Sequence, residues 1–359
     1  MLNTLPFLFL GLPFGALIDS MNLKRVLNFA DVIRAISYMA LAIFFFCTKN
    51  SLLLIIAIYV LTGITACVNV INNIAETTFI PEIVENNEFS KMNSIIFGMQ
   101  YIAGLIVPLI GGYIYSYDIV PYIFIGNATT FLISAAMIYN IHYSYSKKKE
   151  SFSLSSKVKT LSSDLMDGIK YVKQNSSVGL TLFAVSISNF LTSNFENDVL
   201  VFFKIDKAFS SASIGRFLMV SFFGALVGSL ICTKLFNKYS FKKLLLSNFF
   251  FHIVFRMMFI LFDLNISYVL SLFMIYLLSS ILNILVISNR QKVVERKYLG
   301  RVNSIYKTVL IGMNSLGYLY GGFVTNLIGV KDSMILSTIL LALFSIIISP
   351  FIISNIKEN

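Results

Sequence analysis

Long apolar segments recur along the chain, separated by shorter polar stretches. Eleven segments are marked by hydropathy, and most approach or exceed the roughly 20 residues that an α-helix needs to cross a bilayer. They cover residues 1–18, 26–46, 51–74, 94–116, 119–141, 178–202, 213–236, 243–262, 266–289, 302–327 and 331–354. The pattern predicts an all-α membrane protein with about eleven transmembrane helices.

The longest polar stretch, residues 143–177, separates the first five apolar segments from the last six. It contains three consecutive lysines, a Ser-rich run and then residues 164–173, whose apolar spacing predicts a short amphipathic helix on the membrane surface. We therefore expect an N-terminal bundle over residues 1–142, a cytoplasmic linker over 143–177 and a C-terminal bundle over 178–359.

Two short patterns recur at an offset of 210 residues. The sequence Lys-Met-Asn-Ser at 91–94 is matched by Arg-Val-Asn-Ser at 301–304, and the glycine pair at 111–112 is matched by the pair at 321–322. Such a recurrence indicates duplication of a helical unit, so the two bundles should be pseudo-symmetric. In this register the first bundle has one helix fewer than the second at its N-terminal end.

The composition supports a membrane location. Of the 359 residues 57% are hydrophobic and 13% are charged, which leaves too little polar surface for a water-soluble globule. The net charge of +11 could indicate nucleic acid binding, but twenty Lys and Arg residues fall in one set of alternate loops and five in the other. Under the positive-inside rule, this bias predicts a multi-pass protein of the cell membrane with a cytoplasmic C-terminus and no nucleic acid partner.

Small and charged residues surround the first polar loop: Gly15, Asp19, Lys24, Arg25, Asp31 and Arg34. Gly15 would allow two helices to approach closely, and Asp19 could accept hydrogen bonds at a helix N-terminus and attract Arg34. A basic loop that only obeys the positive-inside rule would explain Lys24 and Arg25. It would not explain Asp31 and Arg34 inside a span, where charges cost several kcal/mol unless they are paired, so we favour an interacting cluster over an ordinary basic loop.

A second motif lies within the segment 94–116 and consists of Ala103, Gly104, Pro108, Gly111 and Gly112. Pro108 removes a backbone donor and should kink the helix, while the small residues should let a neighbouring helix pack closely. A glycine-packed helix without a special function is the alternative interpretation.

Both motifs resemble signatures of the major facilitator superfamily. The first resembles the loop between the second and third helices, which in the family is a cytoplasmic latch, and the second resembles the antiporter motif on the fifth helix of exporters. Residues 121–134 and 164–171 resemble the macrolide-efflux and enterobactin-exporter branch. The resemblance implies the superfamily fold without its first helix, so that residues 1–142 would hold family helices 2–6 and residues 178–359 helices 7–12.

The resemblance also implies a function. We expect a monomeric secondary active transporter without a cofactor, which exports an amphipathic drug, macrolide or siderophore against proton entry by alternating access. A non-transporting remnant of such a carrier is the alternative. The sequence has no nucleophile–base pair, metal-ligand spacing or phosphate-binding glycine loop, so we expect neither an enzyme nor a metal site.

Polar residues inside the spans are the candidates for the transport path. By their depth along each span, the cavity candidates are Gln100, Asn127, Asn189, Asn283 and Asn314, although each could equally be a structural hydrogen-bonding group. The candidates for proton coupling are Glu196, Asp198 and Arg256. Glu196 and Asp198 fall near the outer end of their span, so a solvated position is the alternative for them. Lys307 is expected to extend to the membrane surface.

Overall fold

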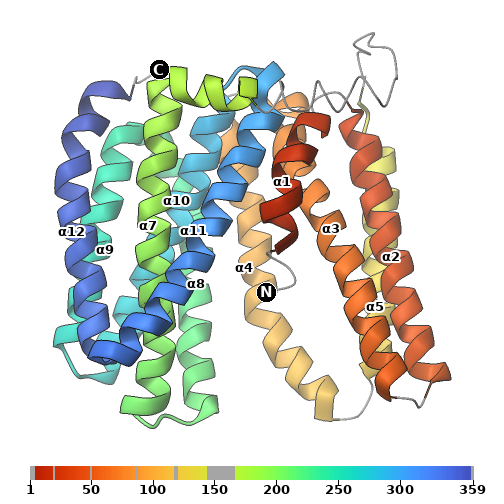
Figure 1. Ribbon diagram of the computed structural model, residues 1–359, viewed down its shortest axis with the longest axis horizontal. Helices are drawn as coiled ribbons and strands as arrows, with labels where there is room; N and C mark the ends of the chain where they lie inside the picture. The colour runs from red at the N-terminus through yellow and green to blue at the C-terminus, as the bar shows by residue number, and fades with distance from the viewer. Residues whose placement is uncertain are drawn as a thin grey trace. The chain divides into compact units, whose positions relative to one another are not determined.

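The computed structural model describes residues 5–18, 21–48, 51–85, 88–116, 120–143 and 166–356. Within these ranges eleven long α-helices follow the predicted spans, and no β-strand occurs (Figure 1). The helices are α1 (Leu5–Ile18), α2 (Leu23–Cys47), α3 (Ser51–Ile83), α4 (Phe89–Ser116), α5 (Val120–Asn140), α7 (Ser176–Val201), α8 (Ser211–Lys238), α9 (Phe241–Leu261), α10 (Asn265–Val293), α11 (Leu299–Ile328) and α12 (Val330–Asn355). Among the described residues, eight helices are long and apolar enough to cross a membrane. The predicted all-α membrane fold is confirmed.

Several helices begin at a polar side chain that caps them. Asn22 accepts a hydrogen bond from the backbone N–H of Arg25 at 3.1 Å at the start of α2, and Asn175 does the same for Val178 at 3.2 Å at the start of α7. These side chains satisfy donors that the first helical turn leaves unpaired. Between α11 and α12 the chain turns at Gly329, whose φ of 87° lies in the left-handed region that favours glycine.

The helices group into two compact units. Unit 1 comprises Met1–Val84, Leu109–Val172 and Val294–Ile311, and unit 2 comprises Glu85–Pro108, Lys173–Val293 and Gly312–Asn359. In unit 1, α2 packs against α3 and α5, and α1 packs against α3; in unit 2, α8 packs against α10, and α12 against α7 and α9. The long helices α4 and α11 each contribute residues to both units.

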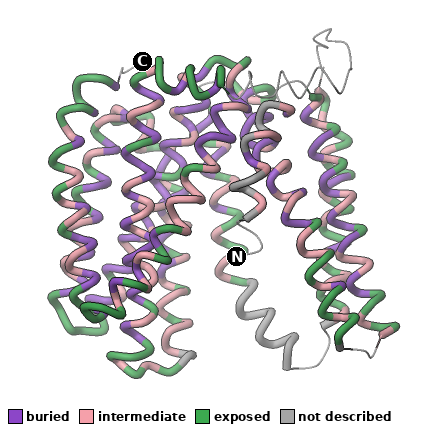
Figure 2. Tube along the Cα trace, in the orientation of Figure 1, coloured by how far each residue is buried: buried purple, intermediate pink, exposed green. Residues whose placement is uncertain are grey.

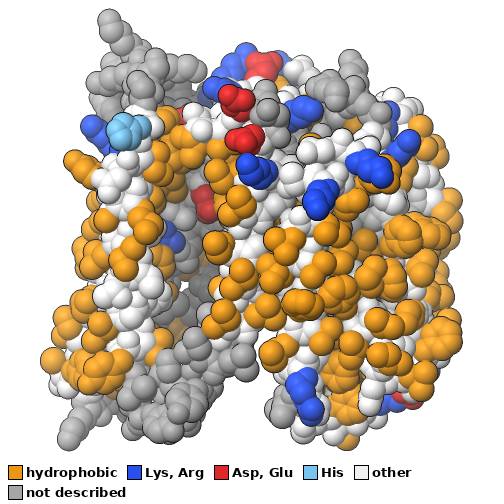
Figure 3. Space-filling view, turned by 180° about the vertical axis from the view of Figure 1, so that it is seen from behind, with side chains coloured by type: hydrophobic (Ala, Val, Ile, Leu, Met, Phe, Trp, Pro, Cys, Tyr) orange, Lys and Arg blue, Asp and Glu red, His pale blue; other side chains and the backbone are white. Residues whose placement is uncertain are grey.

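Apolar side chains occupy both the inside and the outside of these helices. Inside unit 2, Phe195, Phe259 and Tyr268 belong to a buried cluster, and Figure 2 shows burial concentrated on helix faces turned toward neighbouring helices. Outside, large apolar side chains such as Leu230 and Ile346 are 67% and 70% exposed. Figure 3 shows them as a broad hydrophobic band with Lys and Arg gathered mainly toward one end. A surface of this kind is suited to lipid.

Within the predicted linker, a short helix covers residues 166–174; residues 144–165 lie outside the described part of the chain. Gly168 and Val172, four residues apart, are buried, while most of the side chains between them are exposed. A Cβ at Gly168 would lie 3.1 Å from Cβ of Arg301, and the ring of Tyr171 lies 4.7 Å from that of Tyr298. The buried face of this helix therefore packs on the start of α11.

Two glycines allow α8 and α10 to approach closely. Gly224 and Gly228 lie one turn apart on α8, and a Cβ added to either would overlap the backbone carbonyl of Phe273 or Leu277, respectively, on α10. Small residues at a spacing of four are a common means of close helix contact in membranes. Any larger side chain at these two positions would have to push the helices apart.

We therefore expect Gly228→Ala to lower the melting temperature of the detergent-solubilised protein, measured by circular dichroism. Overfilling a packed contact costs about 1–3 kcal/mol. Gly215→Ala is the matched control on the same helix, because nothing lies within 4 Å of a Cβ at that position. The control should melt at or slightly above the wild-type temperature, since Ala favours a helix over Gly. Equal melting of the two variants would contradict the packing argument.

Candidate functional site

A buried ion pair lies between α2, α3 and α5 in unit 1. Arg34 Nη2 pairs with Asp31, its Nη1 donates to Asn69 Oδ1 at 3.2 Å, and its guanidinium carbon lies 4.5 Å from the ring centre of Phe131. The hydroxyl of Ser134 donates to the second carboxylate oxygen of Asp31 at 2.6 Å. Both charged side chains are buried. Asp31 and Arg34 therefore form the centre of this cluster, and their part in a latch stays a prediction.

Two further charges extend this cluster along α3 and α11. Lys307 Nζ donates to Asn73 Oδ1 at 2.9 Å, so its ammonium group faces α3. This differs from the prediction that Lys307 extends to the membrane surface. Glu76, one turn beyond Asn73 in sequence and half-buried, interacts electrostatically with Lys307 and Arg34. Sequence reasoning missed Glu76 because hydropathy ended the span at residue 74, while α3 continues to Ile83.

The rest of the first motif is dispersed. Lys24 Nζ donates at 2.8 Å to the backbone carbonyl of Ile141, just past the end of α5, where helix carbonyls lack partners. Arg25 is exposed. Gly15 lies within α1, and Asp19 lies outside the described residues. Its predicted attraction to Arg34 therefore stays a prediction.

The second motif lies on α4. A Cβ at Gly104 would lie 2.8 Å from the ring of Phe222 on α8, so this glycine makes a close helix contact, whereas Ala103 is exposed. The backbone is helical through Pro108 and the glycines at 111–112. The surroundings of these last three residues lie outside the described part of the chain.

Two asparagines related by the sequence repeat make related hydrogen bonds. Asn93 Nδ2 donates to Ser288 Oγ at 2.9 Å and to Gln291 Oε1 at 2.6 Å, and Asn303 Nδ2 donates to Thr78 Oγ1 at 3.2 Å. The offset of 210 residues that relates the asparagines also relates Thr78 to Ser288. The two asparagines are therefore equivalent in the repeat, and so are the two hydroxyl residues to which they bond. The Asn93 bonds lie within unit 2 and the Asn303 bond within unit 1.

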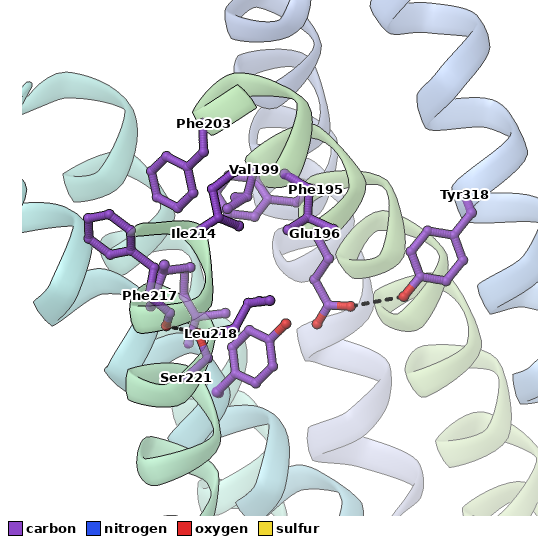
Figure 4. A pocket seen from close by; sticks show the side chains of 13 residues that line it. Phe195, Glu196, Val199, Phe203, Ile214, Phe217, Leu218, Ser221 and Tyr318 are labelled. Carbon is purple, nitrogen blue, oxygen red and sulfur yellow. Dashed lines mark hydrogen bonds between the residues drawn. The ribbon is translucent and has the colours of Figure 1, made fainter. Parts of the chain in front are cut away.

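A cavity of about 90 Å³ lies in unit 2 between α7, α8, α10 and α11 (Figure 4). Its wall is mainly apolar and aromatic, and Glu196 is the one charged residue among those that line it. The hydroxyl of Tyr318 donates to Glu196 Oε2 at 3.2 Å. The hydroxyl of Ser221, also in the wall, donates to the backbone carbonyl of Phe217 at 3.0 Å. The carboxylate of Glu196 therefore faces an otherwise uncharged space.

Arg256 on α9 lies behind this wall. It is 0% exposed, and its guanidinium donates to Thr192 Oγ1 at 2.7 Å and to the carbonyl of Leu191 at 3.4 Å. Its guanidinium carbon lies 4.8 Å from the ring centre of Phe195, which lines the cavity. Arg256 attracts Glu196 electrostatically. Its Nε has no hydrogen-bond partner among the described residues.

Asp198, two residues after Glu196 on the other side of α7, has a different environment. It is fully buried and accepts hydrogen bonds from Thr325 Oγ1 on α11 and from Ser333 Oγ on α12, each at 2.6 Å. The solvated alternative is therefore wrong for Asp198. Its carboxylate joins three helices, and it does not line the cavity.

The end of α7 shapes the aromatic side of the cavity. The chain continues from α7 into a π-helical turn, Phe202–Asp206, and Lys207 pairs with Asp263 in the loop between α9 and α10. Hydrogen bonds from Lys207 and Tyr268 lower the pKa of Asp263, so this carboxylate stays charged and the tie persists. The turn stacks Phe203 on Phe217, with ring centres 4.6 Å apart.

The five predicted amide candidates do not line this cavity. Gln100 and Asn283 are exposed, and Asn127, Asn189 and Asn314 are half-buried. Asn283 hydrogen-bonds with Tyr101 on α4. A transport role for these amides stays a prediction. Within the described residues, no group of three His, Cys, Asp or Glu side chains could hold a metal ion.

Membrane-length apolar helices around buried polar clusters define a multi-pass membrane protein. The chain belongs to the Major Facilitator Superfamily, whose sequence profile matches residues 1–317. The family and the solved structures that resemble the chain are those of transporters. The comparison with curated proteins gives no match.

Three solved structures show the extent of the shared fold. The human organic anion transporter MFSD10 (TETRAN) matches with a TM-score of 0.77 at 13% identity, over 97% of this chain and 82% of that one. An outward-facing bacterial homologue of the iron transporter ferroportin matches at 0.74 and 12%, over 98% and 88%. The proton:xylose symporter XylE, bound to 6-bromo-6-deoxy-D-glucose, matches at 0.74 and 12%, over 99% and 85%. At these identities the likeness shows the fold alone.

We expect Arg34→Gln to lower the melting temperature strongly, because it leaves Asp31 charged, buried and unpaired. Breaking a buried pair on one side costs about 3–5 kcal/mol. The double variant Asp31→Asn, Arg34→Gln should recover part of the loss, since neither charge then remains. Arg25→Gln, at an exposed position on the same helix, is the control and should melt like the wild type. Wild-type melting of Arg34→Gln would rule out a stabilising ion pair.

Proposed function

We propose that the protein is a secondary active transporter that exports an amphipathic small molecule in exchange for protons, by alternating access. The observation that carries this proposal is the carboxylate of Glu196 in the wall of an apolar cavity inside a chain of the transporter superfamily. The direction of transport and the macrolide-efflux or siderophore-exporter branch rest on the sequence motifs. The proposed cell-membrane location with a cytoplasmic C-terminus rests on the charge bias of the loops, and the proposed monomeric state rests on the resemblance to the superfamily.

The surroundings of Glu196 support a role in proton coupling. A coupling carboxylate must be reachable from the transport path and must not be fully neutralised by a permanent partner. Glu196 faces a cavity and has one hydrogen bond from Tyr318. The hydrogen bonds of the nearby Arg256 go to Thr192 and Leu191. The carboxylate of Glu196 can therefore take up a proton without breaking an ion pair.

The repeat-related asparagines support alternating access. Each of the bonds from Asn93 to Ser288 and from Asn303 to Thr78 joins a helix before the linker to a helix after it. Neutral hydrogen bonds between membrane helices contribute about 1 kcal/mol each, so they can close a path without locking it. We propose that both bonds break when the bundles 1–142 and 178–359 move apart on one side during transport. The charged cluster around Asp31 and Arg34 would belong to the same latch.

Expression of the chain should lower the accumulation of at least one of several macrolides or a catecholate siderophore in cells that lack their own exporters. Glu196→Gln should reduce proton-driven export by at least about tenfold, because an amide cannot carry a proton. Glu88→Gln is the control, since that side chain is 53% exposed. A wild-type chain that is present in the membrane at equal amounts and exports none of these compounds would favour the non-transporting remnant.

Cross-linking should test the movement directly. The native Cys47, Cys67 and Cys232 would first be replaced, and cysteines introduced at Asn93 and Ser288 would be joined by a short bifunctional methanethiosulfonate, which forms a disulfide with each thiol. This link should stop export, and its reduction should restore export. The control pair replaces Asn28 and Ala135, where Asn28 Nδ2 donates to the carbonyl of Ala135 at 2.6 Å inside the first bundle. Cross-linking that pair should leave export unchanged. Unimpaired export by the linked Asn93–Ser288 chain would contradict the proposed movement.

A further inference from the structure

The cavity around Glu196 has the composition of an aromatic cage. Phe203 and Phe217 form one side, and Tyr276 and Tyr318 are also in its wall (Figure 4). Phe203 is buried and fixed by its stacking on Phe217, whereas Tyr318 is exposed. The cage therefore has a rigid inner wall and a more accessible side at Tyr318.

Charge decides which ligands such a cage can accept. Aromatic faces carry partial negative charge and attract cations, and they attract alkylammonium groups best because these lose little hydration on burial. Glu196 adds a full negative charge in the same wall. The positive charge of Arg256 lies behind Phe195 and is not part of the lining, so an anionic group in the cavity would meet the carboxylate first.

Size and the number of oxygen atoms narrow the choice further. At about 90 Å³ the cavity is too small for a whole drug molecule, so it could take only the end of one, entering from the exposed side at Tyr318. A bare Ca²⁺ or Mg²⁺ ion requires about six or more oxygen ligands. The wall supplies one carboxylate and the hydroxyls of Tyr276, Tyr318 and Ser221, and the Ser221 hydroxyl donates to the Phe217 carbonyl.

We propose that this cavity is a subsite for a tertiary or quaternary ammonium group, bound by the carboxylate of Glu196 and the faces of the surrounding aromatic rings. The inference rests on the proposed transport function in one respect: that function makes the molecule that carries the ammonium group a transport substrate. Within that function it favours amine-bearing amphipathic substrates over anionic siderophores. Binding of the group itself requires no transport.

A pair of isosteres tests the subsite. Choline carries a trimethylammonium group, and 3,3-dimethylbutan-1-ol has the same shape with a neutral carbon in place of the nitrogen. Each would be titrated into the purified full chain in dodecyl maltoside, a non-ionic detergent without ammonium groups, and binding followed by saturation-transfer difference NMR. The wild type should bind choline at least about tenfold more tightly than the alcohol, from the combined cation–π and ion-pair interactions.

Variants test which residues of the cavity wall bind the ammonium group. Glu196→Gln should weaken choline binding by about tenfold, and Phe217→Leu should weaken it several-fold while the cavity stays apolar; neither should change binding of the neutral alcohol. Glu88→Gln is the matched control and should bind choline like the wild type. If Glu196→Gln does not purify as a monodisperse species, the wild-type isostere pair and Phe217→Leu still decide the outcome. Equal binding of choline and the alcohol by the wild type, or unchanged choline binding by a folded Glu196→Gln chain, would overturn the proposal.

The two proposals can fail separately. A chain that binds choline selectively and exports none of the compounds in the accumulation assay would retain the ammonium subsite and lose the transport function. A chain that exports a macrolide but does not distinguish choline from its isostere would retain transport and lose the subsite.

Discussion

In a bilayer every polar group must find its partner inside the protein, and this requirement governs how the charges of the chain are arranged. Arg34 is satisfied by Asp31 and Asn69, and Asp198 accepts two hydroxyl hydrogen bonds that tie three helices together. Changing Arg34 would leave Asp31 charged, buried and unpaired, and changing Asp198 to an apolar residue would leave two hydroxyl donors without their acceptor. Glu196 differs, because its carboxylate faces a cavity, where it accepts a hydrogen bond from Tyr318. Glu196 is the charged residue in the wall of this cavity, and that position is the basis of the function proposed for it.

Close helix packing is the second consequence of a lipid environment. Burial of apolar surface does not drive helices together in lipid, so contact depends on shape and on a few hydrogen bonds. Gly224 and Gly228 bring α8 against α10, two of the four helices that enclose the cavity. The same helices bear Phe217 and Tyr276 in its wall. The glycines thus determine the spacing at which the aromatic side chains of the cage lie.

The sequence predicted those features that depend only on the order of residues along the chain. Hydropathy located the helices, and the cost of unpaired charge indicated that Asp31 and Arg34 need partners, although it did not show that each is the partner of the other. The predicted end of α3 was wrong because a hydropathy window stops at a charged residue. The helix continues past Glu76, since this residue finds charged partners. The cage could not be predicted, because depth along a span does not give the rotation of each helix about its axis. That rotation, and the π-helical turn at Phe202–Asp206, bring Phe203 to Phe217.

The internal repeat shows which polar groups the two halves of the chain share and which occur in one half only. Asn93 and Asn303 keep equivalent hydroxyl partners, although the two segments have otherwise diverged. In the same register, Glu76 corresponds to Val286 and Lys307 corresponds to Phe97, so the charged cluster of unit 1 has no counterpart in unit 2. A pair of bonds that must form and break together on one side of a carrier benefits from equal strength in both halves. The charged cluster of unit 1 lacks this symmetry, so in the proposed latch it would act in one half alone.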